Sequence, residues 1–401
     1  MQKLRRGITA PKGFLAAGIH AGIKKPPLLD MALITSVVEG PIAGVFTTNR
    51  LPAAPVILDR RHLKRKVGRA IIINSGNANA CTGLQGLRNA EETAQRVANQ
   101  LGCLRQAVYV GSTGVIGPTL PMPFIQKGIP LLVRRLRRSG GREAAQAILT
   151  TDTKVKEVAL EGSIGGQTIR IGGMAKGAGM IHPDMATMLA YLTTDIAIEQ
   201  KVLQTSLQKA VHHTFNCISV DGDTSTNDTV LCLANGLAGN RMIRSRSSDL
   251  NQFQRLLEKA CHSLAMQICR DGEGATKFVD IQVHGAKTNA EAKQIAITVA
   301  TSLLVKTALF GEDPNWGRVI AAVGRAGPSI RADTIHLSFN DIVAVNNGEG
   351  CCASLERRIH RIMRRKTFTL TITVGKGKGS ATVWTTDLSF DYVKINASYR
   401  S

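Results

Sequence analysis

The sequence has few aromatic residues, few acidic residues and no long apolar run. Aromatic residues make up only 4% of the chain, which leaves few of the side chains that single-strand nucleic-acid binders stack against bases. No run of about 18 apolar residues occurs, so we expect no membrane-spanning helix and no membrane partner. Acidic residues number 29 against 51 basic ones, giving a formal net charge of +22. The basic runs at 60–66, 134–138 and 357–366 predict nonspecific adhesion to polyanions at low salt, but no specific nucleic-acid partner.

The chain also lacks the cysteine spacings of metal and redox sites. None of its 8 cysteines stands in a Cys-x-x-Cys pair, and the adjacent Cys351 and Cys352 are poorly placed to form a disulfide with each other. The charged N-terminal residues are not followed by an apolar segment, so no secretory signal is expected. These features predict free thiols and a cytoplasmic location.

A metal site is not expected either. Asp221, Asp223 and Asp228 resemble a calcium loop in composition only. An EF-hand requires a glutamate at its twelfth position, and the twelfth position counted from Asp221 is Cys232.

Short apolar runs alternate with helical patterns along the chain, which predicts a mixed α/β fold: α+β mixed sheets layered with helices. No internal repeat or low-complexity linker is visible. The expected strands are 69–74, 107–110, 188–196 and 278–284, and a hairpin is expected from 368–374 and 381–386. The expected helices are 90–101, 201–215, 249–269 and 289–306.

The most informative segment is KGAGMIHPDMATML, residues 176–189. It places a small residue, Ala186, directly before a hydroxyl residue, Thr187, where a glycine-rich loop meets a strand. Such a hydroxyl can attack the preceding carbonyl, and water then cleaves the resulting ester to leave Thr187 with a free α-amine. That amine has a pKa of about 7.7–8, so it can take the proton of its own hydroxyl near neutral pH. The alternative is a glycine-rich loop that simply feeds a core strand.

Further blocks occur in a fixed order along the whole chain. They are VFTTNR (45–50), NSGNANACTG (74–83), GSTGVIG (111–117), TTDT (150–153), VDGDTSTNDT (220–229), DGEGATK (271–277), GEDPNWGR (311–318) and YVKINA (392–397). Together with residues 176–189, these blocks closely resemble the ornithine acetyltransferase family, also called bifunctional glutamate N-acetyltransferases. The resemblance runs from near the N-terminus to the last residue.

This resemblance implies a self-cleaving, N-terminal-nucleophile-like architecture. Cleavage between Ala186 and Thr187 would give an α chain of residues 1–186 and a β chain of residues 187–401, both belonging to one intertwined fold. The assembly implied is an α2β2 heterotetramer. The activity implied is acetyl transfer from N2-acetylornithine to glutamate through an acetyl ester on Thr187. No cofactor is implied, although acetyl-CoA is a possible co-substrate.

The resemblance also assigns the site residues. The oxyanion pair falls on Thr113 and Gly114. The substrate contacts fall on Thr150, Lys176, Thr187, Glu273, Asn396 and Ser401. Two positions depart from the family pattern, since Ser401 replaces a threonine, and Asp184 stands near the scissile bond where asparagine is more usual.

Two other functions stay open from the residues alone. One is an aminopeptidase or amidase on a related self-cleaving fold. The sequence blocks around Lys176 and Asn396 argue against this alternative. The other is a polyanion-binding protein, suggested by net charge alone.

Overall fold

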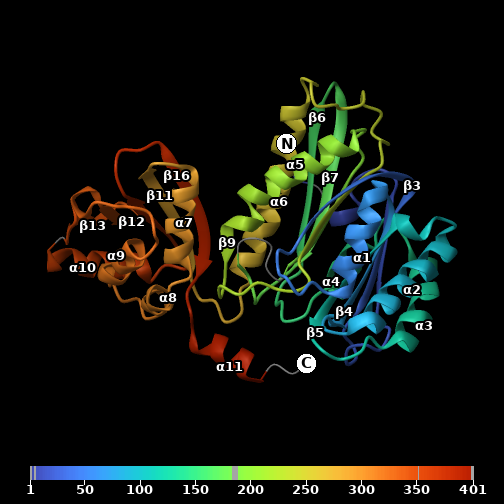
Figure 1. The fold of residues 1–401 in the computed structure, drawn as a ribbon, viewed down its shortest axis with the longest axis horizontal. Helices are drawn as coiled ribbons and strands as arrows, with labels where there is room; N and C mark the ends of the chain where they lie inside the picture. Colours follow the sequence, from blue (N-terminus) through green and yellow to red (C-terminus); the bar gives the residue numbers. More distant parts are fainter. Residues whose placement is uncertain (1, 4–5, 183–187, 351, 399–401) are drawn as a thin grey trace.

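The structure is a computed structural model that describes residues 2–3, 6–182, 188–350 and 352–398. Its described part contains two β-sheets, one of 9 and one of 7 strands, each with its own helices. Figure 1 shows them as two units side by side, with the larger sheet on the right and the smaller on the left. The expected mixed α/β fold is therefore confirmed.

The larger sheet has the order β1-β6-β7-β8-β10-β3-β4-β5, with β2 paired to β3. Its strands are β1 (Gln2–Lys3), β2 (Phe14–Ile19), β3 (Met31–Phe46), β4 (Val67–Asn77), β5 (Val108–Val115), β6 (Lys156–Ile164), β7 (Gln167–Lys176), β8 (Leu189–Thr194) and β10 (Thr229–Ala234). The pairs β4–β5 and β8–β10 are parallel, and the other neighbours are antiparallel. Strands β8 and β10, which follow position 187, thus lie between strands that precede it.

The long strand β3 joins two halves of this sheet. Its residues 31–35 and 40–41 pair with β4, with an irregularity between them, and its residues 42–46 pair with β10. Because side chains alternate between the faces of a strand, one face of each half contributes to a shared inner core. That core contains Ile71 and Ile73 from β4 and Leu189 and Tyr191 from β8.

Helices cover the two outer faces of the halves. The β4–β5 half packs against α2 (Gly83–Leu101) and α3 (Met122–Arg135), and the β6–β8 half packs against α5 (Gln200–His213) and α6 (Leu250–Arg270). Phe253, Leu257 and Leu264 of α6 recur at helical spacing and are fully buried. Two shorter helices, α1 (Ala54–His62) and α4 (Gly141–Ala147), complete this unit.

The smaller sheet has the order β14-β13-β12-β15-β11-β16-β9. Its strands are β9 (Ile218–Ser219), β11 (Phe278–Ala286), β12 (His336–Phe339), β13 (Ile342–Asn346), β14 (Glu349–Gly350), β15 (Thr367–Thr373) and β16 (Gly379–Thr386). Its helices are α7 (Asn289–Ala300), α8 (Leu303–Phe310), α9 (Trp316–Gly324) and α10 (Glu356–Met363). The last helix, α11 (Phe390–Ser398), leaves this unit and runs below the larger sheet in Figure 1.

The expected hairpin of 368–374 with 381–386 is wrong. Strand β11 lies between β15 and β16, parallel to the first and antiparallel to the second. The glycine-lysine segment after β15 crosses the end of β11, where Gly377 N donates to Gly285 O at 3.0 Å. A turn signal in the sequence cannot reveal that a distant strand is inserted between its two arms.

The single helix expected over 289–306 is also wrong. The chain breaks at Ser302, whose ψ of 114° is extended, and α7 and α8 meet at an angle of 57°. The break lets Lys306 turn inward, so that its Nζ donates to Thr385 Oγ1 at 3.2 Å. Among the described residues, no single helix is long and apolar enough to cross a membrane. The bent pair α7 and α8 has that length and apolar content only when the two helices are counted together.

Candidate functional site

Thr113 and Gly114 do not form the turn that a Ser-Thr-Gly sequence suggests but lie within the last residues of strand β5, which runs to Val115. Gly114 lies opposite Gly76 of the parallel strand β4. Its φ is +133°, and a Cβ atom there would lie 2.3 Å from the carbonyl carbon of Gly76, so only glycine fits. The Ser112 hydroxyl donates to Asn74 Oδ1 at 2.6 Å and ties this end of β5 to β4. The missing side chain at Gly114 therefore allows the close pairing of the two strands.

Asp152 organises the segment around Thr150 and the end of β7. Its carboxylate accepts hydrogen bonds from Thr150 N at 3.1 Å and from Gly177 N at 2.7 Å. The Nζ of Lys176, the last residue of β7, lies 4.0 Å from Asp152 Oδ2. Burial alone would raise the pKa of Asp152, but the charges of Lys176 and Lys156 outweigh it and lower the pKa to about 2. Two expected substrate residues, Thr150 and Lys176, therefore share one buried anion.

A second buried lysine supports Asp152. Lys156 Nζ lies 2.6 Å from Asp152 Oδ1 and 2.5 Å from Asp271 Oδ2, and these side chains are at most 4% exposed. Asp271 also accepts hydrogen bonds from the backbone of Thr153 and Lys154 at 3.0 and 3.1 Å. These contacts hold the segment from Thr150 to Lys156 in a fixed position, because breaking one of the buried ion pairs would leave an uncompensated charge.

Glu273 and Asn396 meet in space although they lie far apart in the sequence. Asn396, on α11, donates from Nδ2 to Glu273 Oε2 at 2.9 Å. Glu273 N donates to Ala178 O at 2.8 Å, which holds the glutamate against the segment that follows Lys176. A Cβ at Gly179 would lie 2.3 Å from Glu273 Oε2, so the close approach requires glycine. A cavity of about 660 Å³ adjoins this glutamate.

Other expected residues lie outside the part of the chain that the structure describes. They are Asp184, Ala186, Thr187 and Ser401. The strands before and after 183–187 are adjacent, because Lys176 of β7 pairs with Leu189 of β8. The first residue after the gap, Met188, donates its N–H to Asp228 Oδ1 at 2.8 Å. Asp228 is 1% exposed, and burial raises its pKa well above the usual value, which favours the neutral acid.

The sequence did not single out Asp152, Lys156 or Asp271 as functional. Asp152 and Asp271 stand inside blocks that were quoted for the resemblance alone, and Lys156 begins a strand 115 residues before Asp271. No local signal marks Lys156, because the same strand also carries Glu157 and Glu161.

The aspartates of 221–228 bind backbone segments. Asp221 accepts hydrogen bonds from Met180 N at 2.5 Å and Ile181 N at 2.9 Å, and the Tyr392 hydroxyl donates to it at 3.2 Å. Asp221 thereby positions the start of the loop before residue 183. Within the described ranges, no group of three or more His, Cys, Asp or Glu side chains suited to a metal ion is found.

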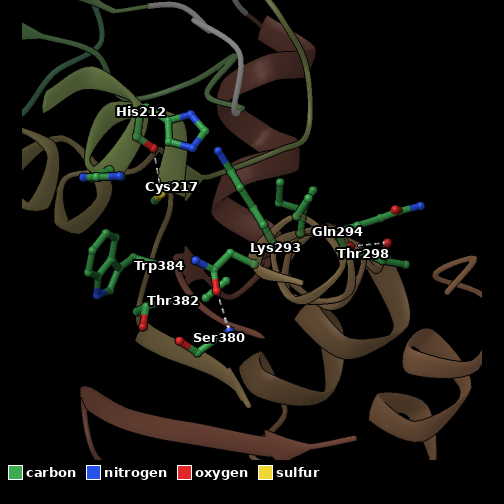
Figure 2. Close-up of a pocket in the computed structure, with 13 residues that line it drawn as sticks. His212, Cys217, Lys293, Gln294, Thr298, Ser380, Thr382 and Trp384 are labelled. Carbon is green, nitrogen blue, oxygen red and sulfur yellow. Dashed lines mark hydrogen bonds between the residues drawn. The ribbon is translucent and has the colours of Figure 1, made fainter. Parts of the chain in front are cut away.

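A separate cavity of about 620 Å³ lies between α5, α7 and β16 (Figure 2). His212, Lys293 and Trp384 are among the residues that line it. Figure 2 shows Cys217 beside His212, to whose carbonyl oxygen its thiol donates at 3.3 Å. The expected site residues that the structure describes do not line this cavity, so it is distinct from the site around Lys176.

The site contains a buried lysine, which can meet a carboxylate, and a glutamate–asparagine pair, which can meet an ammonium group. These are the groups that a protein needs to bind an amino acid. The sequence model of the ArgJ family matches residues 15–401, and the chain belongs to this family. It is therefore a bifunctional acetyltransferase of arginine biosynthesis, as the sequence predicts.

Individual relatives match the chain over nearly its full length. The arginine biosynthesis bifunctional protein ArgJ of Geobacter sulfurreducens is 48% identical over 97% of this chain and 99% of its own. The ArgJ protein of Symbiobacterium thermophilum is 47% identical over 100% of both chains. The crystal structure of ArgJ from Bacillus halodurans aligns with a TM-score of 0.50 at 40% identity, covering 52% of this chain and 98% of the solved chain.

Proposed function

We propose that this chain moves an acetyl group from N2-acetylornithine to glutamate through an acetyl ester on Thr187. The supporting observation is that printed contacts join the expected residues to the segments before and after 183–187. Thr150 and Lys176 share Asp152, and Glu273, which binds Asn396, donates its N–H to Ala178 O. Asn227 donates to Ser112 O, next to Thr113, and the adjacent Asp228 accepts from Met188 N.

The reaction proceeds in two half-reactions. The Thr187 hydroxyl adds to the acetyl carbonyl of acetylornithine, and its α-amine takes the hydroxyl proton. The amide C–N bond then breaks, that proton passes to the leaving nitrogen, and ornithine departs. The amine of glutamate attacks the ester, loses a proton to the α-amine, and leaves as N-acetylglutamate while the Thr187 hydroxyl is restored.

The free α-amine arises by cleavage between Ala186 and Thr187, giving chains 1–186 and 187–401. The extent of the Bacillus halodurans chain supports this proposal. It is matched over 98% of its own length yet covers 52% of this chain, about the share that follows Ala186. The two chains remain in one fold, and pairs of them assemble as α2β2.

The other residues take the following roles in this proposal. Thr113 and Gly114 donate hydrogen bonds to the oxyanion, whose negative charge develops only as the carbonyl is attacked. Lys176 meets the substrate α-carboxylate beside Thr150, and Ser401 contributes a hydroxyl contact. Glu273 meets the side-chain ammonium of ornithine. The enzyme needs no cofactor, acetyl-CoA is an alternative acetyl donor, and the protein acts in the cytoplasm.

An assay with two substrates tests this function. Purified protein is mixed with N2-acetylornithine and glutamate, and ornithine and N-acetylglutamate are measured by mass spectrometry. Equal amounts of both products, with parallel lines in double-reciprocal plots, are the expected result of a ping-pong path. Hydrolysis of peptide amides without transfer to glutamate would instead establish the aminopeptidase alternative.

Replacing Thr113 tests the oxyanion role. We expect Thr113→Ala to lower kcat by roughly 10²–10³-fold with little change in KM, since it removes a hydroxyl that acts mainly on the transition state. Steady-state kinetics on fully processed enzyme give the measurement. An effect confined to KM would make Thr113 a ground-state contact.

A further inference from the structure

Lys24 is a partly buried cation beside the acyl-transfer site, and none of the roles above uses it. It lies in the loop between β2 and β3. The buried carboxylate of Asp30 shapes this loop by accepting backbone N–H groups from four consecutive residues. The donors are Ala21 at 2.6 Å, Gly22 at 3.0 Å, Ile23 at 2.8 Å and Lys24 at 3.0 Å. The backbone at Lys24 is therefore held in a defined place.

The stem of Lys24 lies against Gly76 of β4. A Cβ atom on Gly76 would lie 2.9 Å from Lys24 Cγ. Gly76 is in turn the pairing partner of Gly114 on β5. The missing side chain of Gly76 thus leaves room for the Lys24 stem one strand away from the Thr113–Gly114 segment.

The ammonium group of Lys24 reaches the segment that carries Thr150. Its Nζ donates to Leu149 O at 3.0 Å, directly before Thr150. An ammonium has three donors, and this is the one hydrogen bond that Nζ makes within the described residues. No carboxylate of those residues lies within 4.0 Å of it.

The charges around Lys24 come from the site itself. Burial lowers the pKa of Lys24 to about 8, opposed by Asp30 and Asp152 and assisted by Lys176. Asp152 and Lys176 thus lie close enough to act on the charge of Lys24, and the hydrogen bond to Leu149 O places it on the same side of the site as Thr150.

The buried network next to it is already balanced. Lys156 and Lys176 face Asp152 and Asp271, two cations against two anions. The carboxylate of Asp30 accepts four backbone N–H groups and lies 3.3 Å from His20 Nδ1. A half-buried cation without a close carboxylate fits a place where an anionic ligand supplies the missing charge.

We propose that Lys24 is a second substrate-binding cation, which binds the α-carboxylate of the amino-acid substrate together with Lys176. This inference rests on the proposed function. It differs from a general electrostatic role because the α-carboxylate is common to acetylornithine and glutamate. Both half-reactions should therefore depend on Lys24 to a similar degree.

The test compares Lys24→Met, Lys24→Arg and the adjacent control Lys25→Met, whose side chain is exposed. Each variant is first shown by mass spectrometry to have the chain composition of the wild type. A charge-assisted hydrogen bond contributes about 1.5–3 kcal/mol, which corresponds to roughly a 10- to 100-fold change. We expect Lys24→Met to raise KM for both substrates by that factor, Lys24→Arg to recover most of the loss, and Lys25→Met to match the wild type.

Direct binding separates this inference from the proposed function. Calorimetry measures the affinity for ornithine and for 1,4-diaminobutane, which is ornithine without its carboxylate. Lys24→Met should weaken ornithine binding while leaving the binding of the diamine unchanged. Equal losses for both ligands, or a KM effect on glutamate alone, would overturn the assignment to the α-carboxylate. An inactive wild type would refute the proposed function instead, while binding would still report on Lys24.

The pH dependence gives an independent readout. Lys24 is charged below a pH of about 8 and neutral above it, so kcat/KM should decline as pH rises through this value. Arginine stays charged throughout this range, so Lys24→Arg should shift the alkaline decline to higher pH. An alkaline limb identical in wild type and Lys24→Arg would contradict a binding role for the Lys24 charge.

Discussion

Intact-mass measurement under denaturing conditions should show two chains, the second beginning at Thr187. Thr187→Ala should give one chain of full length, because no hydroxyl is left to attack the carbonyl of Ala186. It should also lose transferase activity by roughly 10⁴-fold or more, since loss of the nucleophile removes the covalent path entirely. Thr187→Ser keeps a hydroxyl and should still be cleaved.

A second comparison concerns the acidic residue near the cut. Asp184 adds a negative charge three residues before Thr187, and Asp184→Asn should cleave at least as fast as the wild type in a time course after synthesis. The self-cleavage proposal fails if wild-type protein stays a single chain and still transfers acetyl groups at full rate.

The sequence predicted most helices and strands of the larger unit, because the spacing of apolar residues within a single segment is enough to identify them. The apolar run at 69–74 is buried in a parallel pair and became the centre of β4. The helical face over 249–269 became α6 almost residue for residue. The two errors described above lie in the smaller unit, where β11 separates β15 from β16 and the chain turns at Ser302 between α7 and α8. Both depend on contacts between distant segments, which periodicity does not record.

The site residues show the same difference between what local patterns predict and what depends on contacts between distant segments. The resemblance pointed to Thr150, Lys176, Glu273 and Asn396, and the described geometry brings them together as two pairs. The contact between Glu273 and Asn396 spans 123 residues, so no local pattern could predict it. Asp152 was missed for a different reason, because a lone aspartate in a loop looks like a surface charge until two lysines are seen against it.

Lys176 carries the other large expected effect. It is 3% exposed and lies 4.0 Å from Asp152 Oδ2. Burial lowers its pKa below the usual lysine value, while Asp152 opposes that shift. Lys176→Met should therefore leave Asp152 with Lys156 as its main counter-charge and remove one of the two cations proposed for the substrate carboxylate. Such truncations typically cost roughly 2–5 kcal/mol, so kcat/KM for acetylornithine should fall by about 30- to several thousand-fold.

Lys64→Met provides the matched control. Lys64 is exposed in the basic run at 60–66, and surface charges contribute only about 0–1 kcal/mol, so its kcat/KM should stay within a few fold of wild type. Because Lys176 stands eleven residues before Thr187, where cleavage is proposed, the chain composition of Lys176→Met must be established by mass before its kinetics are interpreted. A fully processed Lys176→Met enzyme with unchanged kcat/KM would show that this buried lysine serves the Asp152 network alone and does not bind the substrate.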